Sequence, residues 1–278
     1  MNVYHTRNSL KVALQEVRLR GETIGFVPTM GALHDGHLSL VKQALEQTDR
    51  VVVSIFVNPI QFNNAADLAE YPSMLDEDIN LLSEFENILI FAPSSSEIYP
   101  ENDAFKVIDL EGMDAVLEGE FRPGHFKGVV HVVNNLFKIV EPDKAFFGRK
   151  DFQQVAIIQK MVAVLGSVVE IVPCDTKRSE SGLALSSRNL RLSNDEKEAA
   201  LIIFQTLQFI RSLQPHKTPN EAQQAAVDFF NKGELKLEYL AIVDSQSLKE
   251  LTDEWSAEST CCIAAHCGEV RLIDNMQF

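Results

Sequence analysis

The chain has 278 residues, which is enough for one large domain or two ordinary ones with a sizeable buried core. It carries 40 Asp and Glu against 25 Lys and Arg, a formal charge of −15, with 45% apolar residues and a mean hydropathy of −0.04. This balance is typical of a soluble cytoplasmic protein and excludes a broad basic surface for nucleic acid. The longest apolar runs, such as residues 51–56, are too short to span a membrane, and the N-terminal residues lack the apolar core of a signal peptide.

Short β-branched runs alternate with helical patterns through the first part of the chain. The alternation predicts strands at 23–27, 50–58, 88–92, 144–148 and 167–173, and helices over 38–45, 75–85, 129–140 and 152–165. The run at 50–58 is apolar nearly throughout, as strands covered on both faces are. We therefore predict an α/β fold, a Rossmann-like doubly wound parallel sheet with helices on both faces.

The last third of the chain has a different order of elements. Helices are predicted over 194–213, which opens with the capping sequence S-N-D-E, and over 220–231, followed by strands at 237–244, 260–266 and 270–274. This order predicts a smaller C-terminal α+β domain. The polar stretch 175–188 contains the expected boundary, so we divide the chain into domains 1–176 and 177–278.

Two histidines, His34 and His37, lie between a predicted strand and helix in the stretch M-G-A-L-H-D-G-H. Doubly wound sheets bind ligands outside the carboxyl ends of their strands. Gly31 and Gly36 let the backbone approach a ligand, and the start of the helix offers free N–H groups to an anion. The helix dipole favours neutral imidazoles, which would donate hydrogen bonds to phosphate oxygens. The alternative is a pair of turn histidines that only cap backbone groups.

Two later segments carry groups that suit phosphate. Arg149 and Lys150 follow a short strand in F-F-G-R-K-D-F-Q-Q, and Ser186, Ser187 and Arg188 lie in L-A-L-S-S-R-N. Ammonium, guanidinium and hydroxyl groups all donate hydrogen bonds to phosphate oxygens. Taken singly, the first segment is equally typical of a solvated charge cluster and the second of a polar linker.

Two smaller clusters add polar groups. Asn58 and Gln61 follow the second strand and offer neutral donors and acceptors to a polar substrate, although turn chemistry around Pro59 explains them equally well. Glu77 and Asp78 are candidate ligands for Mg²⁺, directly or through water. The alternative is an acidic helix start that matches the dipole.

In combination, these segments carry a family resemblance. M-G-A-L-H-D-G-H, F-V-N-P-I-Q-F, R-P-G-H-F-K-G-V, G-R-K-D-F-Q-Q and L-A-L-S-S-R-N occur in this order and together resemble pantothenate synthetases, the pantoate–β-alanine ligases, over essentially the whole chain. H-x-G-H alone marks only the wider superfamily of nucleotidyl transferases and class I synthetases. The resemblance implies condensation of (R)-pantoate with β-alanine through a pantoyl adenylate, with ATP converted to AMP and pyrophosphate. Residues 1–176 would bind nucleotide and pantoate, and 177–278 would form a lid.

The resemblance also implies roles for individual residues. His34 would contact phosphate, His37 would be the proton donor, and Lys150 and Arg188 would complete the catalytic set. The implied substrate-binding residues are Gln61, Gln154 and Asn58. The implied ATP-binding residues are Met30, Gly31, Ala32, Leu33, His34, Asp35, Gly36, His37, Gly148, Arg149, Lys150, Asp151, Lys177 (near adenine), Leu185, Ser186, Ser187 and Arg188. Mg²⁺ would accompany ATP, and the protein would be a cytoplasmic homodimer that pairs through its first domain.

The sequence departs from the family pattern at four positions. Ser73, Lys127, Arg149 and Lys177 stand where arginine, aspartate, glutamate and an apolar residue are common, and none removes a group needed for catalysis. Three alternatives remain beside the ligase. They are an adenylyltransferase that keeps AMP in its product, a class I tRNA synthetase, which the short acidic chain disfavours, and a non-catalytic ATP-binding protein on the same fold.

Overall fold

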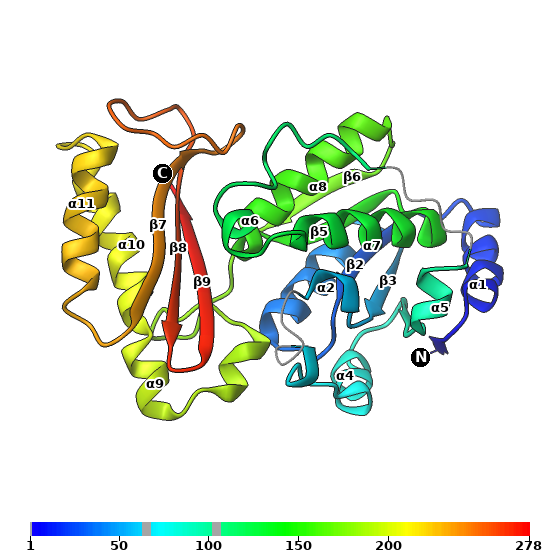
Figure 1. Cartoon of the computed structure of the whole chain (residues 1–278). Coiled ribbons are helices and arrows are strands. Elements are labelled where there is room, and N and C mark those ends of the chain that lie inside the picture. Colours follow the sequence, from blue (N-terminus) through cyan, green and yellow to red (C-terminus); the bar gives the residue numbers. More distant parts are fainter. Residues whose placement is uncertain (1, 63–67, 102–106) are drawn as a thin grey trace.

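The computed structural model describes residues 2–62, 68–101 and 107–278, which form two lobes (Figure 1). Within these residues the larger lobe contains a six-stranded sheet of β1 (Asn2–Tyr4), β2 (Ile24–Thr29), β3 (Arg50–Ile55), β4 (Ile88–Phe91), β5 (Lys144–Gly148) and β6 (Glu170–Cys174). The strand order is β1-β4-β3-β2-β5-β6, and all neighbours are parallel. The predicted doubly wound α/β fold is therefore confirmed.

Helices cover both faces of this sheet. They are α1 (Arg7–Leu19), α2 (Asp35–Gln47), α4 (Leu75–Leu82), α5 (Ser95–Ile98), α6 (Glu118–Phe121), α7 (His125–Val140) and α8 (Phe152–Leu165), with the 3₁₀ turns η1 (Pro59–Gln61) and η2 (Arg149–Asp151). Among all helices in the described ranges, none combines the length and hydropathy that a membrane span requires.

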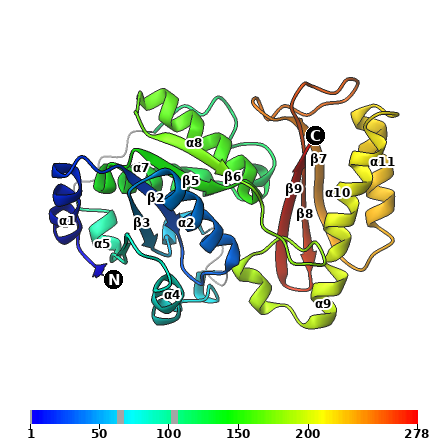
Figure 2. The same ribbon diagram turned by 180° about the vertical axis from the view of Figure 1, so that it is seen from behind.

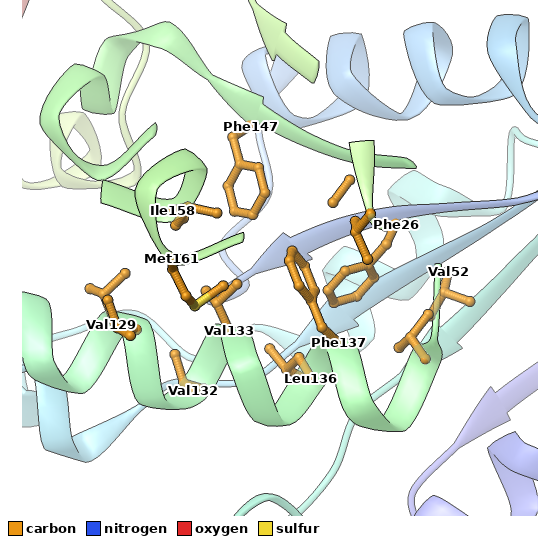
Figure 3. Close-up of a cluster of buried hydrophobic side chains, with 14 of the residues drawn as sticks. Phe26, Val52, Val129, Val132, Val133, Leu136, Phe137, Phe147, Ile158 and Met161 are labelled. Carbon is orange, nitrogen blue, oxygen red and sulfur yellow. The ribbon is translucent and has the colours of Figure 1, made fainter. Parts of the chain in front are cut away.

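Alternation along the strands builds a core on each face of the large sheet. Phe26 and Val52 point to the face covered by α1, α7 and α8, whereas Val27 and Val53 point to the face covered by α2 and α4. Figure 3 shows the first of these cores, in which Phe26 meets Phe137 of α7 edge to face with ring centroids 6.2 Å apart. Because both faces are buried, the central strands are apolar nearly throughout.

The strand order places a crevice between β2 and β5. The chain proceeds from β2 to β3 on one side of the sheet and from β5 to β6 on the other, so the direction of winding reverses between β2 and β5. Loops leave the carboxyl ends of these neighbours in opposite directions, and doubly wound sheets bind their ligands in that opening. The predicted histidine corner follows β2, and the predicted lysine segment follows β5.

The smaller lobe consists of an antiparallel sheet backed by two helices. Its elements are η3 (Ser187–Arg191), α9 (Asn194–Ala199), α10 (Leu201–Leu213), α11 (Pro219–Phe230), β7 (Lys236–Asp244), β8 (Ser259–Cys267) and β9 (Val270–Gln277). In both views α10 and α11 lie on the side of this sheet that faces away from the larger lobe (Figures 1 and 2). Ser193 and Glu196 form the capping box that S-N-D-E predicts at the start of α9.

Three element predictions need correction. The helix expected over 194–213 is two helices, α9 and α10, which meet at Ala200. The strand expected over 50–58 ends at Ile55, because the Asn58 side chain accepts a hydrogen bond from the Ile60 N–H and starts a 3₁₀ turn with Pro59. The short edge strand β1 was not predicted, since a three-residue strand has too little alternation to be detected. Helix α1 was not predicted either, although its buried residues Leu10, Leu14 and Val17 have helical spacing.

Each lobe has its own main core, and a small shared apolar cluster of Leu117, Val243 and Cys262 packs between them. Along the chain, Cys174 is the last strand residue in the cores of the large sheet. Leu192 is the first residue in the core of the smaller lobe. The expected boundary at 176/177 falls in this connection and stays a prediction. Polar contacts join the lobes: the Asn275 amide donates to the backbone carbonyls of Arg149 and Lys150, both at 2.8 Å.

Candidate active site

The corner between β2 and α2 is held by a buried carboxylate. Asp78 of α4 is 1% exposed, and its two oxygens accept hydrogen bonds from the backbone N–H groups of Leu33 (2.6 Å) and Ala32 (2.9 Å). Burial raises the pKa of this carboxyl, and the two N–H groups oppose that rise. Asp78 therefore fixes the backbone of the corner, and its predicted contact with a metal stays a prediction; Glu77, its neighbour, is exposed.

Both histidines of the corner belong to the first turn of α2. His34 is its N-cap: Nδ1 accepts from the Gly36 N–H at 3.1 Å, and His37 Nδ1 accepts from the His34 N–H at 3.3 Å. A Cβ on Gly36 would lie 2.7 Å from the His34 ring, so the glycine between the histidines allows this arrangement. Because both Nδ1 atoms are acceptors, each neutral ring carries its proton on Nε2 and is a hydrogen-bond donor there.

The environment keeps these imidazoles uncharged. Burial lowers the pKa of His34 to about 4, with a contribution from the Lys150 ammonium. Burial also lowers the pKa of His37 to about 3, and His34 and Lys150 add to the effect. The neutral state was predicted, but from the helix dipole; desolvation is its main cause. The two rings lie 4.1 Å apart between centroids.

The carboxyl end of β5 supplies the cation. Lys150 lies in η2, with Nζ 3.4 Å from Asp151 Oδ1, and the Asn275 contact from the smaller lobe fixes its backbone. The neighbouring Arg149 points elsewhere: its Nε is 3.6 Å from Asp175 and its Nη1 donates to Gln277 at 3.3 Å. Lys150 alone of this pair lines the cleft described below.

The serine–arginine segment closes on the histidine corner. The Ser187 hydroxyl is buried and donates to the backbone carbonyl of Ala32 at 3.0 Å. Ser186 caps η3 by accepting from the Arg188 N–H at 3.3 Å, and the Arg188 guanidinium lies over the Tyr71 ring, 5.8 Å from its centroid. This segment therefore lies next to the corner in space, although the two are far apart in sequence.

A buried amide network lies opposite the histidines. Asn58 is 1% exposed and donates to Gln61 Oε1 (3.1 Å) and to the Gly128 carbonyl (3.2 Å), while its Oδ1 accepts from the Tyr99 hydroxyl (2.7 Å) and the Ile60 N–H (3.3 Å). All its side-chain hydrogen-bonding groups are thus engaged with protein. Asn58 thereby holds Gln61 through its Oε1, while the Gln61 NH₂ group donates to Met30 Sδ at 3.0 Å, and all three residues line the cleft. The predicted contact of Asn58 with substrate stays a prediction.

One cleft brings most of the predicted residues together. All predicted site residues are described, and those lining the cleft are Met30, His34, Gly36, His37, Asn58, Gln61, Gly148, Lys150, Asp151, Gln154, Lys177, Leu185, Ser186, Ser187 and Arg188. The predicted residues outside its lining are Gly31, Ala32, Leu33, Asp35, Glu77, Asp78 and Arg149. The carbonyl of Lys177 accepts from the Leu185 N–H at 2.9 Å, which joins two predicted segments at the rim.

Six further polar residues line the same cleft and were not predicted as site residues: Thr29, Tyr71, Arg122, His125, Asp175 and Thr176. Arg122 and His125 belong to R-P-G-H-F-K-G-V, so a histidine and an arginine beside a Pro-Gly turn before a helix were the available signal. Tyr71 had no such signal in the sequence. Apolar side chains complete the wall on the α7 side, among them Val129, Val132 and Val133.

The donors in this cleft suit an anion with several oxygens. Two neutral Nε2–H groups, the Lys150 ammonium and the Arg188 guanidinium line it, and the start of α2 adds backbone N–H groups. Among the described residues, no group of three or more His, Cys, Asp or Glu could hold a metal ion. The donors of the cleft can bind and polarise phosphate oxygens.

Fold and site together define a Rossmann-like enzyme of the H-x-G-H class, which includes nucleotidyl transferases and class I synthetases. The profile of the family described as pantoate-beta-alanine ligase matches residues 2–277. The chain belongs to this family of ligases, which confirms the resemblance carried by its motifs.

Individual relatives agree over the full length. The pantothenate synthetase of Phocaeicola vulgatus is 49% identical over 281 residues, covering 100% of this chain and 99% of the relative. The crystal structure of pantothenate synthetase from Thermus thermophilus superimposes with a TM-score of 0.93 at 41% identity and covers 99% of both chains. The pantoate-beta-alanine ligase of Francisella tularensis, complexed with beta-gamma ATP and beta-alanine, has a TM-score of 0.81 at 34% identity and covers 99% of this chain and 97% of its own.

Proposed function

We propose that this protein condenses (R)-pantoate with β-alanine to pantothenate at the expense of ATP, with a pantoyl adenylate as intermediate. The observation that carries the proposal is the single cleft at the β2/β5 crevice, where the histidine corner, the lysine segment and the serine–arginine segment meet. Membership of the ligase family and the complexed relative from Francisella tularensis support the same substrates.

The chemistry needs an activated acid, because the oxygen of a carboxylate is a poor leaving group. In the first step the pantoate carboxylate attacks the α-phosphorus of ATP and pyrophosphate leaves. In the second step the amine of β-alanine attacks the acyl carbon and AMP leaves. Neither step requires a covalent bond to the enzyme, so positioning and stabilisation of phosphoryl charge are the main tasks.

The cleft supplies groups for the first step. His34 and His37 would donate from Nε2 to the phosphoryl oxygens, and Lys150 and Arg188 would add full positive charges as pyrophosphate departs. The neutral imidazoles suit this role, since a donor fixed in place needs no protonation change before the reaction.

Pantoate fits the opposite wall. Its hydroxyl and carboxylate oxygens would contact the amides of Gln61 and Gln154, and its two methyl groups would pack on Val129 and Val133 of α7. Asn58 contributes by holding the Gln61 amide in one orientation.

We propose that Mg²⁺ enters with ATP as part of the substrate. Mg²⁺ keeps several waters and is bound mainly by phosphates with one or two carboxylates, so a protein cage is not required. Two carboxylates line the cleft, Asp151 and Asp175, and Asp151, which contacts Lys150, would contribute directly or through water.

The division into a nucleotide- and pantoate-binding domain (1–176) and a lid (177–278) remains part of the proposal. The serine–arginine segment starts the lid, and its closure on the corner would keep water away from the labile adenylate. We also propose a cytoplasmic homodimer that pairs through the first domain. Sedimentation analysis at several concentrations would detect the monomer if that prediction is wrong.

An omission assay tests the function. ATP, pantoate and β-alanine are supplied together and with each left out, while pyrophosphate, AMP and pantothenate are measured. We expect pyrophosphate release to require pantoate and multiple turnovers with free AMP to require β-alanine as well. An adenylyltransferase would keep AMP in its product, and ATP binding without pantoate-dependent pyrophosphate release would indicate a non-catalytic protein.

A further inference from the structure

His125 is a cleft residue with a tautomer opposite to that of the two corner histidines. Its Nδ1 lies 2.8 Å from the backbone carbonyl of Gln61. A carbonyl oxygen only accepts, so the Nδ1 of His125 carries the proton. In the neutral ring the lone pair is then on Nε2. His34 and His37 have the reverse arrangement and are donors at Nε2.

His125 contributes to the wall of the cleft, and it also lines a smaller adjoining cavity toward the smaller lobe. The residue is 6% exposed and lines the site cavity together with Gln61 and Gln154. Within the described residues, His125 Nε2 has no hydrogen-bond partner. The fully buried side-chain atoms that lack a partner are Ser54 Oγ and Asn189 Oδ1, so His125 Nε2 is not fully buried. A nitrogen that is unpartnered and still reaches solvent space inside a cavity is available to a ligand.

Packing keeps this ring in place. His125 is the first residue of α7, and α7 approaches η1 so closely that a Cβ on Gly128 would lie 2.9 Å from the backbone of Gln61. The same turn thus carries the Gln61 amide and accepts the Nδ1 proton of His125. Burial lowers the pKa of His125 to about 4, with the Arg122 guanidinium adding to the shift, so the ring is neutral at pH 7.

The two half-reactions need different groups. During adenylation negative charge builds up on the phosphoryl oxygens. The hydrogen-bond donors that would stabilise it are His34, His37, Lys150 and Arg188. Amide formation requires the opposite, because the attacking nitrogen must lose protons, and none of these four offers a lone pair.

We propose that His125 is a further catalytic residue, whose Nε2 accepts a proton from the attacking amine in the second half-reaction. This inference rests on the proposed function. β-Alanine loses one ammonium proton to solvent, and the neutral amine attacks the acyl carbon of the adenylate. As the C–N bond forms, a second proton passes from nitrogen to Nε2. The bond from the acyl carbon to the phosphate oxygen breaks and its electron pair leaves with AMP. The imidazolium then returns its proton to water.

The test separates the half-reactions in His125→Asn, whose amide NH₂ can replace the Nδ1–H donor to Gln61 but offers no lone pair at the Nε2 position. Pantoate-dependent exchange of labelled pyrophosphate into ATP reports the first step. Single-turnover amide formation, started by adding β-alanine to preformed adenylate complex, reports the second. We expect exchange within about threefold of the unmodified protein and amide formation slower by roughly 10²- to 10³-fold.

Chemical rescue gives a readout that a structural role would not move. In His125→Ala, added imidazole should restore part of the amide-forming rate and leave the exchange rate unchanged. His216→Asn is the matched control, because His216 is exposed in the turn between α10 and α11 and lies far from the cleft lining. It should leave both rates unchanged.

The outcomes distinguish a failure of the proposed ligase function from a failure of the role proposed for His125. If the unmodified protein shows no pantoate-dependent exchange, the proposed function is wrong. If exchange is present and His125→Asn lowers both rates in parallel, or neither, His125 has no part in the second step. Absence of imidazole rescue, with folding of His125→Ala verified by its melting temperature, would also overturn the inference.

Discussion

The Ser187 hydroxyl donates a hydrogen bond to the backbone carbonyl of Ala32 across 3.0 Å, although 155 positions separate the two residues. Ser187 begins η3 at the start of the smaller lobe, and Ala32 belongs to the corner after β2. Ala32 is in turn fixed by Asp78 through its N–H. The serine–arginine segment therefore lies directly against the corner where we propose that phosphate binds.

Ser187→Ala should weaken nucleotide handling. The change removes one hydrogen bond and leaves a buried carbonyl unpaired, which costs about 1–2 kcal/mol, or roughly a 5- to 30-fold lower kcat/KM for ATP. Steady-state pyrophosphate release at varied ATP measures it. The matched control is Ser181→Ala, because Ser181 is exposed and its hydroxyl pairs with the Ser179 hydroxyl at 2.8 Å. An equal effect of both substitutions would mean that the Ala32 contact has no role.

Lys150 and His37 are expected to contribute to adenylation itself. Lys150→Ala removes a positive charge and His37→Ala removes an Nε2–H donor. Each should slow pantoate-dependent pyrophosphate release by roughly 10²- to 10⁴-fold. Measurement at saturating ATP and pantoate keeps binding effects apart from the chemical step. Near-normal turnover in both variants would reject these roles and leave His34 and Arg188 as the remaining donors to the phosphoryl oxygens.

Asp78→Asn tests whether the buried carboxylate positions the corner or binds metal. An amide NH₂ would face the N–H of Leu33 or of Ala32, so the free energy of unfolding should fall by about 1–3 kcal/mol and adenylation should slow with it. Urea unfolding and pyrophosphate release measure the two effects. Glu77→Gln, the exposed neighbour, should change neither. Recovery of activity at high Mg²⁺ concentration would instead support the metal role.

The sequence predicted those parts of the molecule that depend on local pattern. Short, nearly continuous apolar runs predicted β2 to β5 within a few residues, because both faces of those strands are buried. The histidine, lysine and serine–arginine motifs predicted the hydrogen-bond donors that line the cleft. Local pattern did not reveal β1, since it depends on pairing with β4 at the sheet edge.

Roles that depend on contacts between distant segments could not be predicted. Asp78 looked like a metal ligand, and only the fold places it under the corner. The sequence predicted that Asn58 contacts substrate. Its side chain hydrogen-bonds to Tyr99 and Gly128, and these contacts depend on the fold and not on local sequence. His125 carried no assigned role, because its tautomer follows from a carbonyl 64 positions away.

Asn58→Asp should make the oxygen and the NH₂ group of the Gln61 side-chain amide exchange positions. An aspartate has no N–H to donate to Gln61 Oε1, so Gln61 would turn its NH₂ toward the carboxylate and its oxygen toward the cleft. Pantoate, which presents a carboxylate, would then meet an acceptor. We expect KM for pantoate to rise at least tenfold with a smaller change in KM for ATP, measured by pyrophosphate release. An unchanged KM for pantoate would show that Asn58 does not orient Gln61.

Acid should destabilise the fold through three buried imidazoles, those of His34, His37 and His125. Burial lowers their pKa values to about 4, 3 and 4, whereas in the unfolded chain they titrate near 6.5. Between these limits the unfolded state binds more protons than the folded state, so the free energy of unfolding falls as pH drops from about 6.5 toward 4. Above about pH 7 both states are neutral at these sites and their contribution is constant.

Urea unfolding of the unmodified protein and of His37→Gln at pH 7, 6 and 5 measures the effect of one imidazole. Carboxylates with lowered pKa values, such as Glu22 at about 2, also reduce stability in acid, so the comparison uses the difference between the two proteins. Removing an imidazole that stays neutral when folded should make the loss of stability between pH 7 and pH 5 smaller in His37→Gln. His216→Gln, at an exposed site, should follow the unmodified protein. Parallel curves for all three proteins would mean that His37 takes up its proton in the folded state as readily as in the unfolded chain, and the neutral donor assigned to it would then be wrong.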